Sequence, residues 1–370
     1  MKHFGKFSDI AGEVYEATLF AISRIIPLIV TGGLLIAFSS LIGTKLLGMD
    51  LSDSAEHLSY GAAGSLLYVL NQSGTLVLAF MLPLLSSYIA VNIAGKEAAV
   101  AGLIAGIISM GGISGIISVP ESGYFGSICG GGAAGFLTLW MKRNADRESG
   151  RRNAPFYNTF LVPLLSSFLT ILLMYYCLAP LFGLLIDWLY AGLLWLQDHH
   201  LRILVGGVTG AMSNFDFGGP VNKLAYNYSR VLFDAGNREY YAAFTAAKII
   251  PGISVFLAAK LYPGLFTQNE REQALPAAFM SCFGGITEGA IPYALQDPVP
   301  VIFAEMAGGA AAAAMVMSMR IDIAVNAGGS LLSVFMVSDP WKWVGALMTG
   351  LAVTLLLLYI LKRHFRKIGK

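Results

Sequence analysis

The sequence predicts an all-α membrane protein of about ten transmembrane helices with two re-entrant or broken segments. Hydrophobic residues make up 56% of the 370 residues and charged residues only 12%, against roughly 25% charged residues in an ordinary soluble domain. Long uncharged runs recur along the chain, and the carboxylate Glu288 lies among apolar segments with glycine and proline around it. The apolar composition predicts the membrane, the runs predict helices, and the glycine-rich carboxylate segment predicts irregular backbone.

Six uncharged runs reach about the 20 residues that a helix needs to cross the hydrocarbon core. They are Ile25–Thr44, Leu58–Gly95, Ala98–Pro120, Ser122–Met141, Asn153–Ile186 and Trp343–Leu361. Between Asp187 and Asp339 charged residues interrupt shorter apolar stretches. These charges are Asp216, Lys223, Arg230, Lys248, Lys260, Glu288, Asp297, Glu305, Arg320 and Asp322. Interrupted segments of this kind are typical of discontinuous helices around a transporter site.

The basic residues indicate the orientation, because cytoplasmic loops carry an excess of lysine and arginine. The loop Lys142–Arg152 and the tail after Leu361 are both rich in them, so both are expected in the cytoplasm. Lys2, Lys6 and Arg24 place the amino end on the same side, so the number of crossings is expected to be even. The apolar run after Arg24 is too long for a cleaved signal peptide, and the first helix is expected to be a signal anchor.

Ladders of small residues, at Gly102–Gly106 and Gly130–Gly135, precede the basic loop. Such faces let helices approach closely, and packing within one chain explains them as well as contact between two subunits does. The charged and glycine-rich interruptions all follow the loop. The loop therefore divides the chain into two regions, and a binding site is expected in the second.

Several classes of function are not indicated by the composition. The net charge is near +2 and the basic residues serve topology, so no nucleic-acid partner is expected. Cys129, Cys177 and Cys282 are isolated in apolar surroundings, and the five histidines do not assemble into a metal constellation. No metal and no cofactor is expected.

Glu288 lies within the string GGITEGAIP, Gly284–Pro292. An ionisable side chain among membrane segments costs several kcal/mol unless it faces protein, water or a ligand, so its default interpretation is a functional group. Glycine and proline on both sides predict an irregular backbone, which membranes tolerate where the chain lines a cavity or is buried in protein. The segment is therefore expected to contribute to a polar site.

A second break lies in SNFDFGGPVNK, Ser213–Lys223. Its Gly-Gly-Pro interrupts a helix and exposes peptide groups, and Asn222 offers donors and an acceptor that suit hydroxyl groups. A simple turn between two helices explains this string too, and Asp216 suits a helix cap as well as a ligand. The presence of two such breaks favours a polar site near the middle of a transporter.

The two broken segments match a known family. FDFGGPVNK at Phe215–Lys223 and GITEGAIP at Gly285–Pro292, followed by Asp297-Pro298, closely resemble the membrane-spanning enzyme IIC component of the fructose-type bacterial phosphotransferase system, within the glucose-fructose-lactose superfamily. Further similar segments occur in the family's order, and the resemblance covers about residues 10–360. These segments are Ile26-Pro27 with Thr31–Ala37 in the opening helix, Met81–Ala90 and Tyr124–Gly135.

The resemblance implies a homodimeric sugar permease of the bacterial cytoplasmic (inner) membrane, with both termini in the cytoplasm. It implies a scaffold-like half at about 10–152, a substrate-binding half at about 153–361, and a basic cytoplasmic tail at 362–370. The protein would carry a fructose-like hexose or hexose derivative across the membrane and present it to a phosphorylated IIB partner. Phosphoenolpyruvate would supply the phosphoryl group through general carriers, IIA and IIB.

The resemblance also implies which residues form the site. Glu288 would hydrogen-bond sugar hydroxyls and could ease removal of the proton from the attacking hydroxyl. Thr287, Asn222 and the peptide groups near Gly218, Gly219 and Gly289 would complete the site, with Asp216 as a further candidate; these seven positions are the predicted substrate contacts.

The sequence itself is consistent with a phosphoryl group that a partner protein supplies. None of the three cysteines is followed by proline, so the Cys-Pro-x-Gly signature of a IIB domain does not occur here, and neither does a Gly-x-x-x-x-Gly-Lys-Ser/Thr phosphate loop. The chain is therefore expected to be a transport subunit rather than an enzyme alone, because phosphoryl transfer to the sugar occurs with IIB. Its own contribution would be to hold the sugar in line with the donor.

At two positions the sequence departs from the family pattern, which limits what the resemblance implies for this chain. The family often has Pro-His-Gly-Gly where this chain has Asn326–Gly329, so Ala327 occupies the place of a histidine and the sugar is left open. Lys248 interrupts a segment that is expected to be more apolar, where it either pairs with an acid or extends to an interface. An ion-coupled secondary transporter stays an alternative, with Glu288 carrying a proton and Asp216 or Lys223 as its partner, and so does a membrane sensor without transport.

Overall fold

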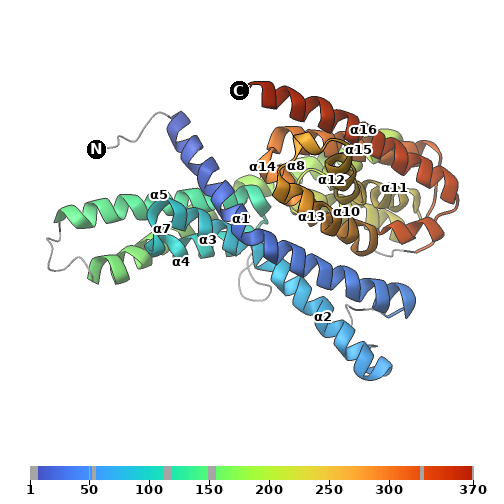
Figure 1. The fold of residues 1–370 in the computed structure, drawn as a ribbon. Helices are drawn as coiled ribbons and strands as arrows, with labels where there is room; N and C mark the ends of the chain where they lie inside the picture. The colour runs from blue at the N-terminus through green and yellow to red at the C-terminus, as the bar shows by residue number, and fades with distance from the viewer. Residues whose placement is uncertain are drawn as a thin grey trace. The chain divides into compact units, whose positions relative to one another are not determined.

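Helices are the secondary-structure elements of the residues that the computed structural model describes, which are 7–49, 51, 56–111, 119–148, 156–325 and 329–368 (Figure 1). Within these ranges the one extended pairing is an isolated bridge between Ile323 and Val337. Among these described residues, six helical segments are long and apolar enough to cross a membrane. They are Ile10–Thr44, Leu58–Ala94, Tyr157–Asp198, Glu239–Leu261, Pro298–Ser318 and Pro340–Phe365. The expectation of an all-helical, multi-pass membrane protein is thus confirmed.

Four of these segments coincide with runs that the sequence indicated, and the other two do not. Glu239–Leu261 and Pro298–Ser318 are helical segments of spanning length even though Lys248 and Glu305 lie inside them. Glu305 is fully buried, and one of its oxygens is hydrogen-bonded by the Ser254 hydroxyl at 2.5 Å. A polar partner on a neighbouring helix makes such a charge tolerable without a break in the helix.

The run Ala98–Pro120, by contrast, is not one continuous helix. Helix α4 (Ala99–Ser109) ends before Gly111, whose φ of +89° is the left-handed conformation that glycine adopts at helix ends. Helix α5 (Gly123–Glu148) then begins after a short connection, part of which lies outside the described residues. Glycine-terminated helices account for the difference, because hydropathy alone does not register backbone conformation.

The chain folds into two compact units. The first comprises Met1–Leu28 and Ala79–Trp188, and the second comprises Ile29–Leu78 and Leu189–Lys370, so the boundaries fall within α1 (Phe7–Ser39) and α8 (Ala179–Asp198) and at the end of α2 (Gly61–Ala79). This division by internal contacts follows a different line from the predicted scaffold-like and substrate-binding halves, which remain a functional prediction.

Small residues allow very close helix packing in the first unit, which contains α3 (Met81–Ala94), α4, α5 and α7 (Val162–Leu173). A Cβ on Gly131 of α5 would lie 2.6 Å from the Ser86 carbonyl oxygen of α3, and one on Gly102 of α4 would lie 2.8 Å from the same oxygen. Such contacts between backbones require glycine. The glycine ladders are therefore used for packing within the chain.

Lys142 links two of these helices at one end of the unit. Its ammonium donates to the Ala94 carbonyl oxygen at the end of α3 and pairs with Glu97 at 2.9 Å. Partial burial raises the pKa of Glu97, but the hydrogen bond and charge of Lys142 outweigh this effect and leave the pKa below its ordinary value. The first residue of the predicted basic loop thus also closes a helix end.

The second unit holds most of the remaining helices around buried aromatic side chains. The helices are α2, α9 (Arg202–Ser213), α10 (Pro220–Asp234), α11 (Glu239–Lys248), α12 (Ile250–Leu261), α13 (Gln268–Phe279), α14 (Ile291–Gln296), α15 (Pro298–Ser318) and α16 (Pro340–Ile368). Trp343, Tyr241, Tyr293 and Phe244 are its largest fully buried aromatic side chains, and the Trp343 indole donates to the Ala242 carbonyl oxygen. The buried indole is thus satisfied, as such groups need to be.

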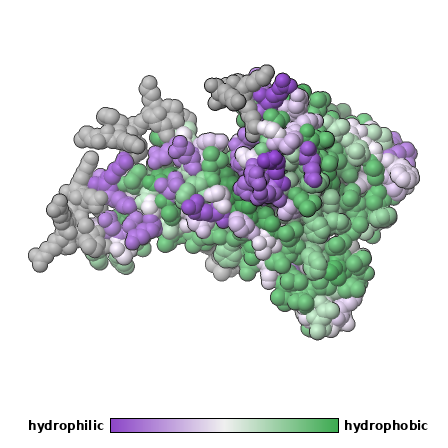
Figure 2. Space-filling model, viewed as in Figure 1, coloured by the Kyte–Doolittle hydropathy of each residue, from purple (hydrophilic) through white to green (hydrophobic). Residues whose placement is uncertain are grey.

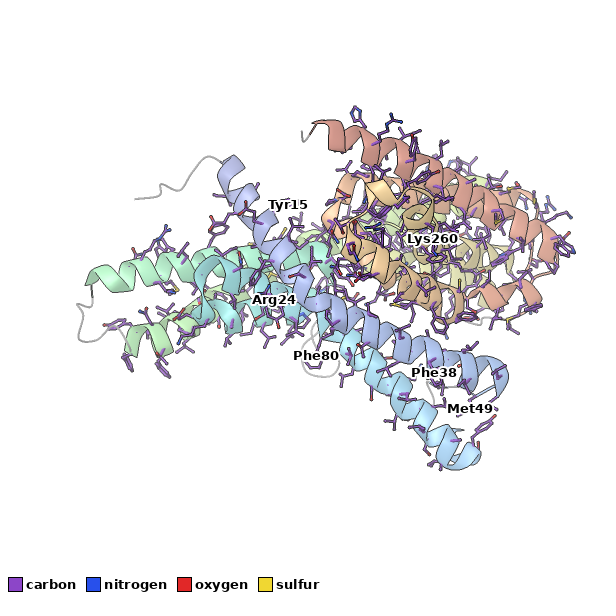
Figure 3. The ribbon with its side chains drawn as sticks, viewed as in Figure 1. Tyr15, Arg24, Phe38, Met49, Phe80 and Lys260 are labelled. Atoms are coloured by element: carbon purple, nitrogen blue, oxygen red, sulfur yellow. The ribbon has the colours of Figure 1, made fainter. Side chains whose placement is uncertain are left out.

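Apolar side chains also cover much of the outer surface. The carboxyl-terminal part of α1 packs against α2 through Gly32 and Gly74. On the outside of this pair Phe38 (Figure 3) is exposed, and so are Leu66 and Leu76. Hydrophobic residues dominate this part of the visible face in Figure 2. Exposed apolar surface on this scale suits contact with lipid tails rather than with water.

Candidate functional site

The first broken segment lies between α9 and α10 and is shaped by an aspartate. Phe217 and Gly218 adopt positive φ angles of +42° and +96°, and α10 then starts at Pro220. The two carboxylate oxygens of Asp216 accept hydrogen bonds from the backbone N–H groups of Val221 and Asn222, at 2.8 and 2.9 Å. Asp216 therefore caps the first turn of α10, where a negative charge is favourable.

The second broken segment follows α13. A π-helical turn, Met280–Gly284, leads to Gly285 in the left-handed conformation and then to a short 3-10 turn, Glu288–Ala290, before α14. The Ser281 hydroxyl donates to the Ile286 carbonyl oxygen and accepts from the Gly252 N–H of α12. This one side chain thus satisfies two backbone groups that the break leaves without helical partners.

The opening helix supports the second break from the other side. Gly33 of α1 lies directly against the side chain of Met280, and a Cβ on Gly284 would lie 3.1 Å from Cβ of Ala37. Gly33 and Ala37 belong to the Thr31–Ala37 string, one of the further segments that resemble the family. Small residues in that string let α1 pack against the segment that carries Glu288.

The two broken segments meet at Gly218 and Glu288. A Cβ on Gly218 would lie 2.7 Å from the carboxylate carbon of Glu288, closer than any real Cβ contact. Glycine is therefore needed at position 218 for two reasons: its φ is positive, and the neighbouring carboxylate leaves no room for a side chain. The Thr287 hydroxyl lies 3.4 Å from a Glu288 oxygen and is also able to donate to it.

A cavity of about 260 Å³ opens where the segments meet. This is near the lower end of the roughly 300–1,000 Å³ of typical small-molecule sites, so it suits a small ligand. It is lined by Gly218, Asn222, Lys223, Tyr226, Lys248, Gly284, Gly285, Ile286, Thr287 and Glu288. Hydroxyl, amide, carboxylate and ammonium groups thus surround one small space among apolar helices.

Lys248 is the unexpected member of this lining. It is the last residue of α11 and half-buried, and its ammonium lies 5.8 Å from the centroid of the Tyr226 ring and 5.7 Å from that of Phe244. Its charge and that of Glu288 attract each other. Of the two explanations that the sequence left open, pairing with an acid fits this arrangement, since Lys248 and Glu288 line the same cavity.

The lining can bind a polyhydroxylated ligand. A carboxylate accepts hydrogen bonds from hydroxyl groups, an ammonium donates them, and an amide and a hydroxyl do both. Tyr226 adds an aromatic ring that can pack against an apolar face of a ligand. The described residues contain no group of three or more His, Cys, Asp or Glu side chains able to hold a metal ion.

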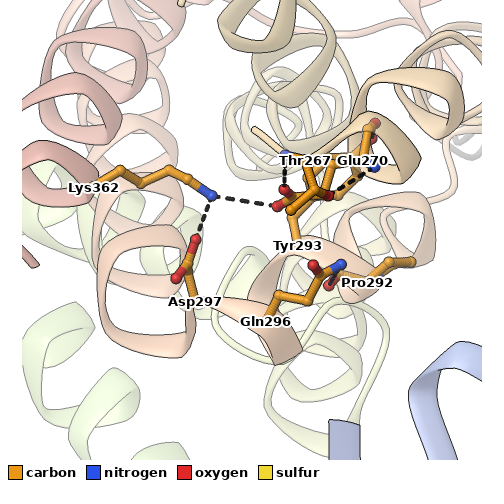
Figure 4. A network of polar contacts seen from close by, with 7 residues as sticks. All are labelled: Thr267, Glu270, Pro292, Tyr293, Gln296, Asp297 and Lys362. Atoms are coloured by element: carbon orange, nitrogen blue, oxygen red, sulfur yellow. Dashed lines mark hydrogen bonds and ion pairs between the residues drawn. The ribbon is translucent and has the colours of Figure 1, made fainter. Parts of the chain in front are cut away.

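A buried ion network holds the segment that follows Glu288 (Figure 4). Lys362 of α16 is almost fully buried and pairs with Asp297 at 2.5 Å and with Glu270 at 3.4 Å. The Tyr293 hydroxyl of α14 donates to the Glu270 carbonyl oxygen at 2.6 Å, and Glu270 closes a capping box with Thr267. The network joins α13, α14 and α16 and so fixes the backbone just beyond the site.

The structure brings four of the seven predicted contacts into the cavity wall: Glu288, Thr287, Asn222 and Gly218. The other three are not part of its lining. Asp216 caps α10, a Cβ on Gly219 would collide with the Asp216 carboxylate, and one on Gly289 would lie 2.9 Å from the Ala277 backbone. Their positions shape the two segments beside the cavity.

Sequence reasoning did not place Tyr226 or Lys248 in the site. Tyr226 is four residues after Asn222 on α10, so helical periodicity could have found it once Asn222 was chosen. For Lys248 the available signal was a charge within an apolar run, but nothing in the sequence indicates that α11 faces the two breaks. Ala327 lies outside the described residues; a Cβ on Gly329 would lie 3.4 Å from Cδ of Lys248.

Comparison with known proteins identifies the same family from a family model and from individual relatives. A family model described as "Phosphotransferase system, EIIC" matches residues 21–309. The fructose-specific EIIC component of Haloferax volcanii is 29% identical over 95% of this chain and 93% of its own length. A fructose-like EIIBC component of Escherichia coli K12 is 27% identical over 97% of this chain and 72% of its own length.

A third relative is the 2-O-alpha-mannosyl-D-glycerate-specific EIIABC component of Escherichia coli K12, 30% identical over 96% of this chain. The chain spans about half the length of the EIIABC relatives that it matches, 52% in this case and 53% for the fructose-specific protein of Bacillus subtilis. The resemblance that FDFGGPVNK and GITEGAIP suggested is confirmed over nearly the whole chain. The chain belongs to the EIIC family of the phosphotransferase system, the membrane-spanning sugar permease components that work with IIA and IIB partners.

Proposed function

We propose that the cavity at Glu288 binds a fructose-like hexose or hexose derivative, which the chain carries across the membrane to be phosphorylated by a IIB partner. The observation that supports this most is the meeting of the two broken segments. They bring Asn222, Thr287 and Glu288 to one cavity inside an otherwise apolar protein. Relatives named for fructose and for a mannosyl-glycerate make a hexose or a hexose derivative the expected cargo.

Glu288 accepts hydrogen bonds from sugar hydroxyls in this proposal, with Thr287 and Asn222 beside it. Gly218 keeps the backbone away from the carboxylate, and Asp216, Gly219 and Gly289 hold the two segments in place. When the site faces the cytoplasm, a sugar held in line with phosphorylated IIB gains from proximity, and Glu288 is able to take the proton of the attacking hydroxyl.

The finer architecture belongs to the same proposal. About ten crossings, with the segments at Gly218 and Glu288 as the two re-entrant or broken ones, would place the site near the bilayer midplane. The basic residues of the Lys142–Arg152 loop and of the tail favour cytoplasmic termini. We also propose that the protein is a homodimer surrounded by lipid, in which each chain has a scaffold-like half and a substrate-binding half.

Inverted membrane vesicles containing the chain test the proposal, because their cytoplasmic face is accessible to added phosphoenolpyruvate, general carriers, IIA and IIB. We expect labelled sugar loaded inside to appear outside as sugar phosphate, in a reaction that needs phosphoenolpyruvate and IIB and is unaffected by an uncoupler. Vesicles without the chain, and reactions without IIB, are the controls. Uncoupler-sensitive movement of unmodified sugar would instead support an ion-coupled carrier.

A further inference from the structure

A chain of hydrogen bonds begins at a buried carboxyl group on α15 and ends at the segment that carries Glu288. Its members are Glu305 of α15, Ser254 and the Pro251–Gly252 peptide group of α12, and Ser281 and the Ile286 carbonyl group of the second broken segment. Ile286 lines the cavity together with Thr287 and Glu288, whereas Glu305 does not. The chain therefore links a side chain outside the cavity to its wall.

Chemistry fixes the direction of three bonds in this chain. The Gly252 N–H donates to the Ser281 hydroxyl at 3.1 Å, and that hydroxyl donates to the Ile286 carbonyl oxygen at 2.9 Å. The carbonyl oxygen of the same peptide group, on Pro251, accepts from the Ser254 hydroxyl at 2.9 Å. Hydrogen bonds that run in one direction polarise and strengthen one another.

The fourth contact then needs a proton from Glu305. Oγ of Ser254 lies 2.5 Å from one Glu305 oxygen, but a hydroxyl has a single proton and the Pro251 carbonyl oxygen accepts it. The hydroxyl is able to accept from Glu305, and a carboxyl group donates only when it is protonated.

The surroundings of Glu305 also suit an uncharged group. The side chain is fully buried, and its second oxygen has no hydrogen-bond partner among the described residues. None of the ion pairs of the described residues includes Glu305. A buried carboxylate without a cation is costly, whereas a hydrogen-bonded neutral acid avoids most of that cost.

The same turn of α15 holds the first broken segment. The Asn214 amide, directly after α9, donates to the Glu305 carbonyl oxygen at 3.1 Å and to the Ala247 carbonyl oxygen at 3.2 Å. A Cβ on Gly309, one turn further along α15, would lie 2.6 Å from the amide nitrogen of Asn214. The backbone of Glu305 thus contacts the first broken segment, and its side chain is linked to the second.

We infer that Glu305 is a neutral carboxylic acid that positions the sugar site. Its proton goes to Ser254, and the hydrogen bonds that follow hold the Ile286 carbonyl group, two residues before Glu288. The inference rests on the proposed function, since it concerns the same cavity. Glu305 and Glu288 then have different roles, because Glu305 acts through its proton and Glu288 through its negative charge.

Equilibrium sugar binding by purified full-length variants tests the positioning role. The probe is whichever of D-fructose and 2-O-alpha-mannosyl-D-glycerate the wild type binds, the sugars for which two relatives are named. Glu305→Gln keeps a donor of the same shape and should bind as the wild type does, in contrast to Glu288→Gln. Glu305→Met keeps the length without the donor and should weaken binding about three- to ten-fold, the contribution of one hydrogen bond.

Ser254→Ala shows whether the effect passes through the chain. It should weaken binding as Glu305→Met does, and the double variant should bind no more weakly than either single variant, because both changes remove the same link. Thr354→Val is the matched control. The Thr354 hydroxyl is also buried, but it donates to the Gly350 carbonyl oxygen within α16, outside the chain, so affinity should not change.

Infrared difference spectroscopy detects the proton itself. The spectrum of the wild type minus that of Glu305→Gln, at neutral pH, should contain the C=O stretching band of a protonated carboxylic acid. Glu305→Met should give the same difference band, and Thr354→Val should not. A purely structural role of the side chain would not require this band.

The outcomes distinguish this inference from the proposed function. A carboxylate band in place of the acid band, equal losses of affinity in Glu305→Gln and Glu305→Met, or wild-type affinity in Glu305→Met would each overturn the inference. Sugar binding by the wild type and its loss in Glu288→Gln would still support the proposed function. If Glu305→Met does not fold, Ser254→Ala and the infrared band decide. A wild type that binds neither sugar would contradict both.

Discussion

Both units of the chain pack helices closely through glycine, and the second unit also uses glycine at a polar cavity. In the first unit Gly131 and Gly102 lie so close to the Ser86 carbonyl oxygen that their lack of a side chain lets three helix backbones meet. In the second unit Gly218 leaves room for a carboxylate, with its positive φ turning the chain around Glu288. The first arrangement produces a tightly packed helical unit, and the second produces a polar cavity.

The units also differ in how deeply their ion pairs are buried. The Lys142–Glu97 pair of the first unit is partly exposed at a helix end, whereas Lys362 and Glu270 of the second are almost fully buried. A buried pair depends on both partners, because the removal of one leaves an uncompensated charge. The comparison teaches that the unit with the candidate site contains an almost fully buried ion pair, whereas the Lys142–Glu97 pair of the first unit lies at a partly exposed helix end.

The largest expected effect concerns the buried network. Lys362→Met should leave Glu270 and Asp297 without their cation and lower stability by about 3–5 kcal/mol, measured as the thermal midpoint and yield of the detergent-purified protein. Lys342→Met is the control, because Lys342 pairs with Asp339 at the surface and such exposed pairs contribute little to stability. Equal losses in the two variants would remove the distinction between buried and exposed charge.

The next effect concerns backbone packing in the first unit. Gly131→Ala should push α5 away from Ser86 and cost about 1–3 kcal/mol, the usual range for overpacking. Gly192→Ala is the matched helical change, since nothing lies within 4 Å of a Cβ at that position. We expect it to be neutral or slightly stabilising because alanine favours helix. An unchanged thermal midpoint for Gly131→Ala would contradict the close approach of α5 and α3.

The smallest effect distinguishes the cost of a positive φ at Gly218 from the contact between position 218 and Glu288. Gly218→Ala and Gly236→Ala both place a side chain at a φ near +95°, but a Cβ meets the Glu288 carboxylate in the first and nothing in the second. Both should pay a similar conformational cost of about 1–2 kcal/mol. Gly218→Ala alone should also weaken sugar binding by about five-fold or more, about 1 kcal/mol. Equal affinities for the two variants would mean that Gly218 does not position Glu288.

Much of this could be predicted from the sequence, because some signals are local. Composition and uncharged runs predict membrane helices, and two glycine-proline breaks predict a polar site at Asn222 and Glu288, to which the family resemblance adds Thr287. The capping role of Asp216 was one of two interpretations, and the choice depended on whether Val221 and Asn222 turn their N–H groups toward it. Spacing permits that geometry but does not require it.

The rest depends on contacts between distant parts of the chain. Glu305 stays within an unbroken helix because Ser254, 51 residues earlier, hydrogen-bonds it. Lys248 lines the cavity because α11 packs where the two breaks meet, and Gly33 supports Met280 from the far end of the sequence. No sequence periodicity predicts contacts between such distant residues, so the place of Lys248 in the cavity wall is known only from the fold.

The most direct test of the central claim is sugar binding by Glu288→Gln, which removes the negative charge with almost no change in shape. The account predicts normal membrane insertion and thermal midpoint, with loss of affinity for the sugar that the wild-type protein binds. Glu272→Gln, on an exposed part of α13, should bind as the wild type does. Wild-type affinity in the Glu288→Gln variant would contradict the assignment of the cavity as the sugar site.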